Sequence, residues 1–130
     1  MYFEGIDFYK SFYESLYAKN KNYTEIIWIL ARLYSASGDT RKSMKMDRKC
    51  VRLDPTNPMA HYNLACSLAL AGKKTEAITE IQRAIELGYN DRQWFNDDTD
   101  LDSLRNCQRF KDLISGKKMG APKSCNKQTS

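Results

Sequence analysis

A repeat of 34 residues constrains this chain more than any other feature of its sequence. Residues 24–55 align with residues 58–89 at an offset of 34. The identical pairs are Leu30 and Leu64, Ala31 and Ala65, Gly38 and Gly72, and Leu53 and Leu87. A period of this length, with two amphipathic helices in each unit, indicates a helical solenoid whose repeats stack on one another. Stacked repeats create an extended surface, so the repeat favours a binding function over catalysis.

Length and composition point to a single soluble domain. The chain has 130 residues, of which 42% are hydrophobic and 28% charged, and one domain usually takes about 100–200 residues. No run of about 18 apolar residues occurs, and no basic start leads into an apolar segment. We therefore expect a cytoplasmic protein with no membrane span and no signal peptide.

The positive charge is concentrated near the C-terminus. Residues 115–130 contain Lys117, Lys118, Lys123 and Lys127 and no acidic residue. Subtracting these four charges from the net charge of +5 leaves +1 for the rest of the chain. The positive net charge is therefore mostly that of the C-terminal tail, and nucleic acid is not the expected partner. The polar composition of this tail predicts disorder.

Aromatic residues are dense in the first helix that the pattern predicts, over residues 4–19. The stripe expected to pack against the next helix consists of Ile6, Tyr9, Tyr13 and Leu16. Phe8 and Phe12 lie four residues apart and form a second stripe, with no evident partner within the chain. Because exposed apolar patches often mark interfaces, this stripe predicts weak self-association or a partner contact.

Helix signals divide the repeats into pairs of helices. The first repeat begins near Asn22, turns at residues 37–39 and ends before Pro55. In the second repeat, Asn57 followed by proline is a helix start, and Gly72 marks the turn. After Gly88 the period fades, and residues 92–114 supply short helices that we interpret as a cap over the last apolar face.

Both repeats resemble the tetratricopeptide repeat family. In the second repeat the places of the family pattern are held by His61, Leu64, Ala65, Leu68, Gly72, Ala77, Ile81 and Ala84. In the first repeat the same places hold Ile27, Leu30, Ala31, Tyr34, Gly38, Ser43, Asp47 and Cys50. Asp47 departs from the pattern because a large apolar residue is usual there, so its helix is expected to pack loosely or to be more exposed. The segment from Trp94 to Phe110 looks like the atypical end-of-array element of many bacterial members.

The resemblance implies an all-α fold, a short right-handed helix-turn-helix solenoid. It covers about residues 22–114, where it implies two full repeats with a C-terminal cap. The residue pattern and composition add an aromatic-rich N-terminal helix at residues 1–21 and a disordered basic tail at 115–130. The resemblance also implies a non-enzymatic scaffold or adaptor that binds a peptide segment of another protein in the concave groove. Two alternatives stay open: a self-assembling structural module, and a regulatory fragment of a larger enzyme.

Position within the repeats predicts which side chains line the groove. In such arrays the first helix of each repeat faces it, which selects Trp28, Arg32, Met59, Tyr62, Asn63, Cys66, Gln93 and Asn96. Aromatic rings with an arginine and amides suit a peptide, since rings bury its side chains and amides satisfy its backbone. The alternative is that these residues only pack between helices.

A basic face lies on the second helix of the first repeat. Its cations Arg41, Lys45, Arg48 and Arg52 are spaced by four, three and four residues. They could bind an acidic protein or phosphates. The more ordinary interpretation is a solvated helix face, with cations favoured near the helix C-terminus by the dipole.

The sequence offers no catalytic constellation. The single histidine, His61, occupies a packing position, and Cys66, five residues on, faces another direction on a helix. The aspartates at 97, 98, 100 and 102 are dense in oxygen, but they lack the glycine turn and the closing glutamate of a calcium loop. We therefore expect no enzymatic activity, no metal and no cofactor.

Overall fold

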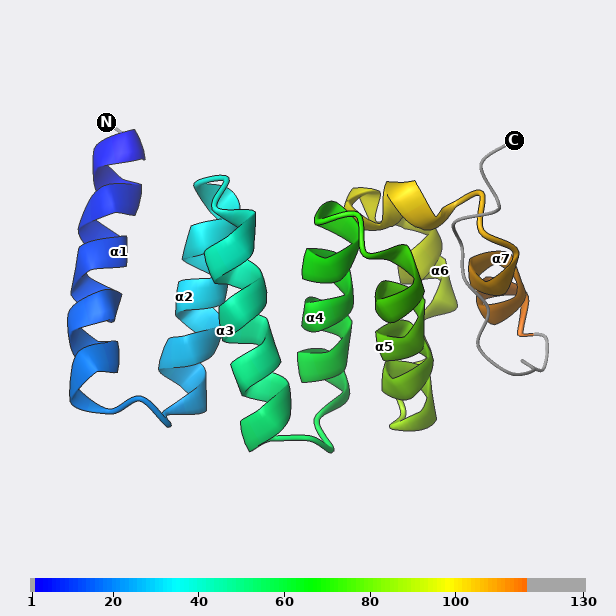
Figure 1. Cartoon of the computed structure of the whole chain (residues 1–130), viewed down its shortest axis with the longest axis horizontal. Helices are drawn as coiled ribbons and strands as arrows, with labels where there is room; N and C mark the ends of the chain where they lie inside the picture. Colours follow the sequence, from blue (N-terminus) through cyan, green and yellow to red (C-terminus); the bar gives the residue numbers. More distant parts are fainter. Residues whose placement is uncertain (1, 117–130) are drawn as a thin grey trace. The chain divides into compact units, whose positions relative to one another are not determined.

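The computed structural model describes the backbone of residues 2–116 and the side chains of residues 5–116. Figure 1 shows the elements, which are α1 (Tyr2–Lys19), α2 (Thr24–Ala36), α3 (Thr40–Leu53), α4 (Pro58–Leu70), α5 (Lys74–Glu86), α6 (Arg92–Asp97), the 3-10 helix η1 (Thr99–Leu104) and α7 (Gln108–Ser115). No strand occurs in this part of the chain, and the predicted all-α class is confirmed. The predicted tail lies outside the described residues from position 117 onward.

The 34-residue period reappears in the helix boundaries. Helices α2 and α4 begin at 24 and 58 and end at 36 and 70, and α3 and α5 begin at 40 and 74. Each pair turns at a glycine with positive φ, 82° at Gly38 and 79° at Gly72. Glycine adopts this conformation without the steric cost that a Cβ imposes. The predicted helix-turn-helix pairs are therefore confirmed.

The described residues form two compact units, which divide between residues 56 and 57. The aromatic N-terminal helix lies in the same compact unit as the first helix pair. In the first unit α2 packs against both α1 and α3. The Tyr34 hydroxyl donates a hydrogen bond to Glu14 of α1 at 2.6 Å, and the Ser43 hydroxyl donates to the Ala31 carbonyl at 3.1 Å.

In the second unit, α4 packs against α5 and η1, while α7 contacts α5 and α6. Phe95, Leu101 and Leu104 are fully buried. These apolar side chains anchor the segment after Gly88 onto the helix pair, as the predicted cap requires.

Asp47 does not loosen its helix. It is 1% exposed, and both of its carboxylate oxygens lie 3.0 Å from Nη2 of Arg32. The expectation of loose or exposed packing at Asp47 was therefore wrong, because an ion pair between half-buried Arg32 of α2 and buried Asp47 of α3 replaces the usual apolar contact. The second repeat has Cys66 and Ile81 at the corresponding places, 34 residues on.

Candidate functional site

The face of α4 that was expected to be open is covered within its own unit. Tyr62 is 4% exposed, and Asn63 and Cys66 are also buried. The Tyr62 ring lies with its centroid 5.0 Å from that of Tyr89 and 5.4 Å from that of Phe95. The expectation that these three α4 residues line an open groove was wrong, because all three are buried, and Tyr62 and Cys66 contact Asp98 of the C-terminal cap.

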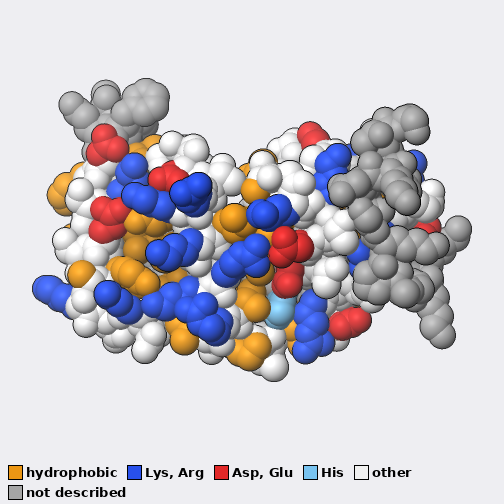
Figure 2. Space-filling model, in the orientation of Figure 1, with side chains coloured by type: hydrophobic (Ala, Val, Ile, Leu, Met, Phe, Trp, Pro, Cys, Tyr) orange, Lys and Arg blue, Asp and Glu red, His pale blue; other side chains and the backbone are white. Residues whose placement is uncertain are grey.

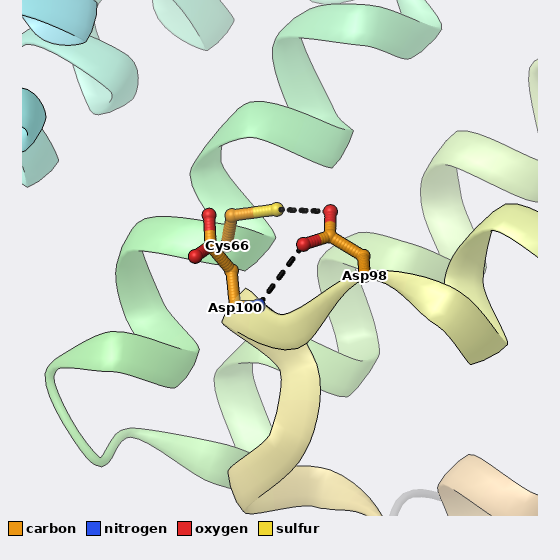
Figure 3. Close-up of side chains that lie close together, drawn as sticks. All are labelled: Cys66, Asp98 and Asp100. Carbon is orange, nitrogen blue, oxygen red and sulfur yellow. Dashed lines mark hydrogen bonds between the residues drawn. The ribbon is translucent and has the colours of Figure 1, made fainter.

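Asp98 fastens the cap to α4. One of its carboxylate oxygens accepts hydrogen bonds from the Tyr62 hydroxyl and from Cys66 Sγ, the latter at 3.7 Å. The other oxygen accepts from the Asp100 backbone N–H at 3.0 Å and so caps η1 (Figure 3). Burial, together with neighbouring Cys66 and Asp98, raises the pKa of the Tyr62 phenol above its ordinary value. The phenol therefore stays protonated and able to donate.

The same cluster brings together three groups that could ligate a metal. Ligand atoms of Cys66, Asp98 and Asp100 all lie within 4.8 Å of one another. Both oxygens of Asp98 already accept the hydrogen bonds that hold the cap, so the arrangement has a structural explanation. A group of acidic side chains without a further observation does not define a metal site, and we assign none.

The remaining residues expected in the groove have varied environments. Trp28 of α2 is 46% exposed, and Met59, Gln93 and Asn96 are also exposed. Arg32 is half-buried and held by Asp47, so its guanidinium is not freely available as a groove cation. Trp28 holds in α2 the place that Tyr62 holds in α4, 34 residues on. This position is therefore exposed in α2 and covered in α4.

The predicted basic face forms one wall of a pocket between α1 and α3. The pocket has a volume of about 380 Å³, and its lining, called here the basic pocket, is Tyr17, Arg41, Met44, Lys45, Met46, Arg48, Lys49 and Arg52. Figure 2 shows lysine and arginine side chains gathered over the helices of this unit, with hydrophobic atoms between them. All four cations of the predicted face line it. The sequence pattern did not reveal the contributions of Tyr17 and the two methionines.

Lys49 connects the two walls of the basic pocket. Its Nζ donates a hydrogen bond to the Tyr17 hydroxyl at 2.8 Å and lies 4.8 Å from the centre of the same ring. Cation–π contacts of this kind occur within about 6 Å of the ring centre. The contact holds Tyr17 of α1 against α3 and places the ammonium charge of Lys49 over the Tyr17 ring.

The second aromatic stripe of α1 is exposed. Phe8 and Phe12 are 64% and 48% exposed, and their rings stack with centroids 6.3 Å apart. Tyr9 is exposed too, although it was expected to pack against the next helix. Helix α1 therefore presents more aromatic surface than its contact with α2 uses.

His61 is part of a polar contact between α4 and α5. Its Nδ1 lies 2.6 Å from Oε1 of Glu80. The Cys66 thiol instead contacts Asp98, so the histidine and this cysteine have different partners. The His61–Glu80 pair thus joins the two helices of the second repeat.

None of the helices within residues 2–116 combines the length and the apolar character that crossing a membrane requires.

Comparisons with known proteins identify the fold and the family of this chain. No curated protein sequence matches this chain. The crystal structure of MamA, a protein that contains tetratricopeptide repeats, is similar with a TM-score of 0.63 and 23% sequence identity. The match covers 85% of this chain and 67% of the MamA chain. The expected likeness to tetratricopeptide repeats therefore holds for the fold.

The family that matches is a different one from the tetratricopeptide repeat family. Its description is "A/B hydrolase-like, N-terminal domain", and its match spans residues 22–120. This range includes both helix pairs and the cap, and it is more than half of the chain. The chain belongs to the family of A/B hydrolase-like N-terminal domains.

Proposed function

We propose that this chain is a non-enzymatic module that binds a segment of another protein on the face of α2 that carries Trp28. The helical-repeat fold supports this, because such folds offer long helix faces to partners. The proposal keeps the protein-binding scaffold predicted from the repeat. It restricts the binding face to the first unit, since the cap covers the corresponding face of α4.

The proposal is supported by the second unit, where a segment of this chain occupies the equivalent face of α4. There the segment 98–104 lies on α4: Asp98 binds Tyr62 and Cys66, and the Ser103 hydroxyl donates to the Ala69 carbonyl at 3.1 Å. This chain therefore already contains a peptide segment docked on a first-helix face. In α2 the matching position holds an exposed tryptophan, a residue type enriched among the side chains that dominate binding energy.

The chemistry of the α2 face favours an apolar anchor. Asp47 already balances the charge of the neighbouring Arg32, so this face offers little net attraction for an acidic group. The indole of Trp28 supplies apolar area and one N–H donor. We expect a partner segment that buries an aliphatic or aromatic side chain against the ring.

Replacing Trp28 with alanine is expected to weaken peptide binding by about 2 kcal/mol, or roughly 30-fold. Peptides would first be selected from a random library on the wild-type protein, and their affinities then measured by fluorescence anisotropy. Trp94→Ala is the matched control, because Trp94 is 47% exposed and lies in the second unit. Equal affinities of the selected peptides for wild type and Trp28→Ala would reject the α2 face.

A second candidate follows from the family match. The family name associates this domain with hydrolase-like proteins, which favours the regulatory alternative: the partner would be an α/β-hydrolase domain, in the same protein or in another. Catalysis would then belong to that domain, and we assign no catalytic step to this chain. Copurification with such a domain, disrupted by Trp28→Ala but not by Trp94→Ala, would unite the two candidates.

Self-association through α1 remains the third candidate, and it predicts a specific change. The double substitution Phe8→Ser and Phe12→Ser should shift sedimentation toward the monomer, because both rings are exposed and removing them costs little packing within the chain. Circular dichroism should show nearly unchanged helicity. Tyr23→Ser, which removes another exposed ring, serves as the control. Wild-type protein that sediments as a monomer at high concentration would end this candidate.

A further inference from the structure

We propose that the basic pocket binds an acidic segment of a partner protein, with carboxylates along α3 and apolar side chains on the pocket floor. The proposal rests on the proposed function, since it assumes that the chain binds proteins. It concerns a different surface, formed by α1 and α3, and it names the chemistry of the segment bound there.

Basic side chains outnumber the acidic ones on α3 and at its two ends, where Asp39 forms an ion pair with Lys42 at 3.9 Å. The helix contains six lysines and arginines and one acid, Asp47. That acid is buried and bound by Arg32 of α2, so it does not offset the cations that face outward. No acidic side chain lines the basic pocket. Within residues 5–116, the side chains of Arg41, Lys45 and Arg52 form no hydrogen bond or ion pair.

The helix dipole does not explain this distribution. Cations are favoured in the last turn of a helix, where α3 has Arg52, and disfavoured in the first turn, where a negative charge is preferred. Arg41 nevertheless lies in the first turn, and the acid at that end, the N-cap Asp39, already accepts from the Lys42 N–H and pairs with the Lys42 ammonium group. A solvated face with cations favoured by the dipole therefore explains Arg52 in the last turn of α3, but it does not explain Arg41 in the first turn.

Spacing and floor together define the segment that fits. The cations Arg41, Lys45, Arg48 and Arg52 follow one another at intervals of one helical turn and span about 16 Å. A helical segment with acidic residues three or four positions apart would bring each carboxylate close to a cation. Half-buried Met44 and buried Met46 give the pocket a flexible apolar floor, and methionine adapts well to varied apolar groups.

The same features argue against a nucleic acid. Single strands bind by stacking their bases on open aromatic faces along a basic groove. The aromatic ring of the basic pocket is Tyr17, and Lys49 already lies on that ring. The methionine floor favours aliphatic side chains over bases, so we infer a protein partner.

The test uses the full chain and a fluorescein-labelled peptide of about 12 residues, matched to the length of the basic stripe. Glutamate recurs every three or four residues in this peptide, with leucine between. We expect binding that weakens as salt is added and that falls about tenfold or more with the double substitution Arg41→Glu and Lys45→Glu. A peptide with glutamine in place of glutamate should bind at least about tenfold more weakly to the wild type.

Lys21→Glu with Lys111→Glu is the matched control, because both lysines are exposed, lie outside the basic pocket and give the same change in net charge. This variant should lose less than about twofold in affinity. An equal loss in both variants would overturn the proposal, since it would show attraction to net charge alone. The proposal would also be overturned if the wild type bound the glutamine and glutamate peptides equally well. It would be overturned, too, by pocket-dependent binding of a single-stranded oligonucleotide or of phosphatidylserine vesicles that is tighter than binding of the glutamate peptide.

Trp28→Ala separates this inference from the proposed function. It should leave affinity for the glutamate peptide unchanged while weakening the library-selected peptides. If the glutamate peptide fails to bind and the selected peptides still depend on Trp28, the basic pocket proposal fails and the proposed function stands. If the selected peptides are indifferent to Trp28 while the glutamate peptide depends on the pocket, the α2 face fails instead.

Discussion

Replacing Asp47 with alanine should lower the free energy of unfolding by about 3 kcal/mol, because it breaks an ion pair whose carboxylate is buried. The carboxylate is 1% exposed, and its two oxygens meet Nη2 of Arg32 at 3.0 Å each. Without it, a half-buried guanidinium loses its counter-charge. Nε of Arg32 is already buried without a hydrogen-bond partner among the described residues, so the variant would leave this side chain still less satisfied. Urea unfolding followed by circular dichroism measures the loss.

The second repeat supplies the control. Arg32→Ala combined with Asp47→Ile imitates its small and apolar residues at these places, Cys66 and Ile81. Replacing both members of a buried pair by apolar groups is often neutral or stabilising, so the double variant should recover most of the stability, to within about 1 kcal/mol of wild type. Unfolding of Asp47→Ala at the wild-type urea concentration would show that the pair contributes nothing to stability.

Local signals were sufficient to predict the helix pairs of the two repeats. A glycine at the turn, a polar N-cap and a proline at the first helical position act over a few residues, so they can be read from the sequence alone. Gly38, Gly72 and Asn57 all act as predicted: the two glycines have positive φ, and the Asn57 side chain accepts from the Met59 N–H at 2.9 Å.

The ion pair of the first repeat could have been found by comparing the two repeats. Arg32 and Asp47 are both charged, whereas the residues 34 positions on are both apolar. Two charges of opposite sign on facing helices of one repeat are expected to pair, because either alone would be costly to bury. An aspartate at position 47, considered alone, indicates loose packing. The ion pair with Arg32 explains why it is buried instead.

The covered face of α4 could not be predicted in this way. It depends on contacts between residues more than 30 positions apart, such as that between the Tyr62 hydroxyl and Asp98. Sequence position selected Tyr62 as a groove residue, but it could not show that the cap folds onto that side of α4. The aspartates after α6 were considered only as possible metal ligands, whereas the carboxylate of Asp98 binds across to α4.

Replacing Phe95 with alanine should destabilise the second unit by about 3–5 kcal/mol, because it removes a fully buried aromatic side chain and leaves a cavity. Its ring lies 5.4 Å from Tyr62 and 5.2 Å from Tyr89, centre to centre. Urea unfolding would measure the loss. Trp94→Ala, which removes an exposed neighbouring ring, should cost far less, and equal losses in the two variants would contradict the assignment of Phe95 to the core.

The same variant tests whether the cap is what keeps peptides from α4. Without Phe95, the segment 98–104 loses one of its apolar anchors, and hydrogen exchange should rise in that segment more than in α4 or α5. Because Tyr62 holds the place of Trp28, its exposure would create a second aromatic face of the same kind. In a Trp28→Ala background, Phe95→Ala should therefore restore part of the affinity for apolar library peptides. Failure to restore it, with hydrogen exchange showing the cap released, would mean that an uncovered aromatic first-helix face is not sufficient for binding.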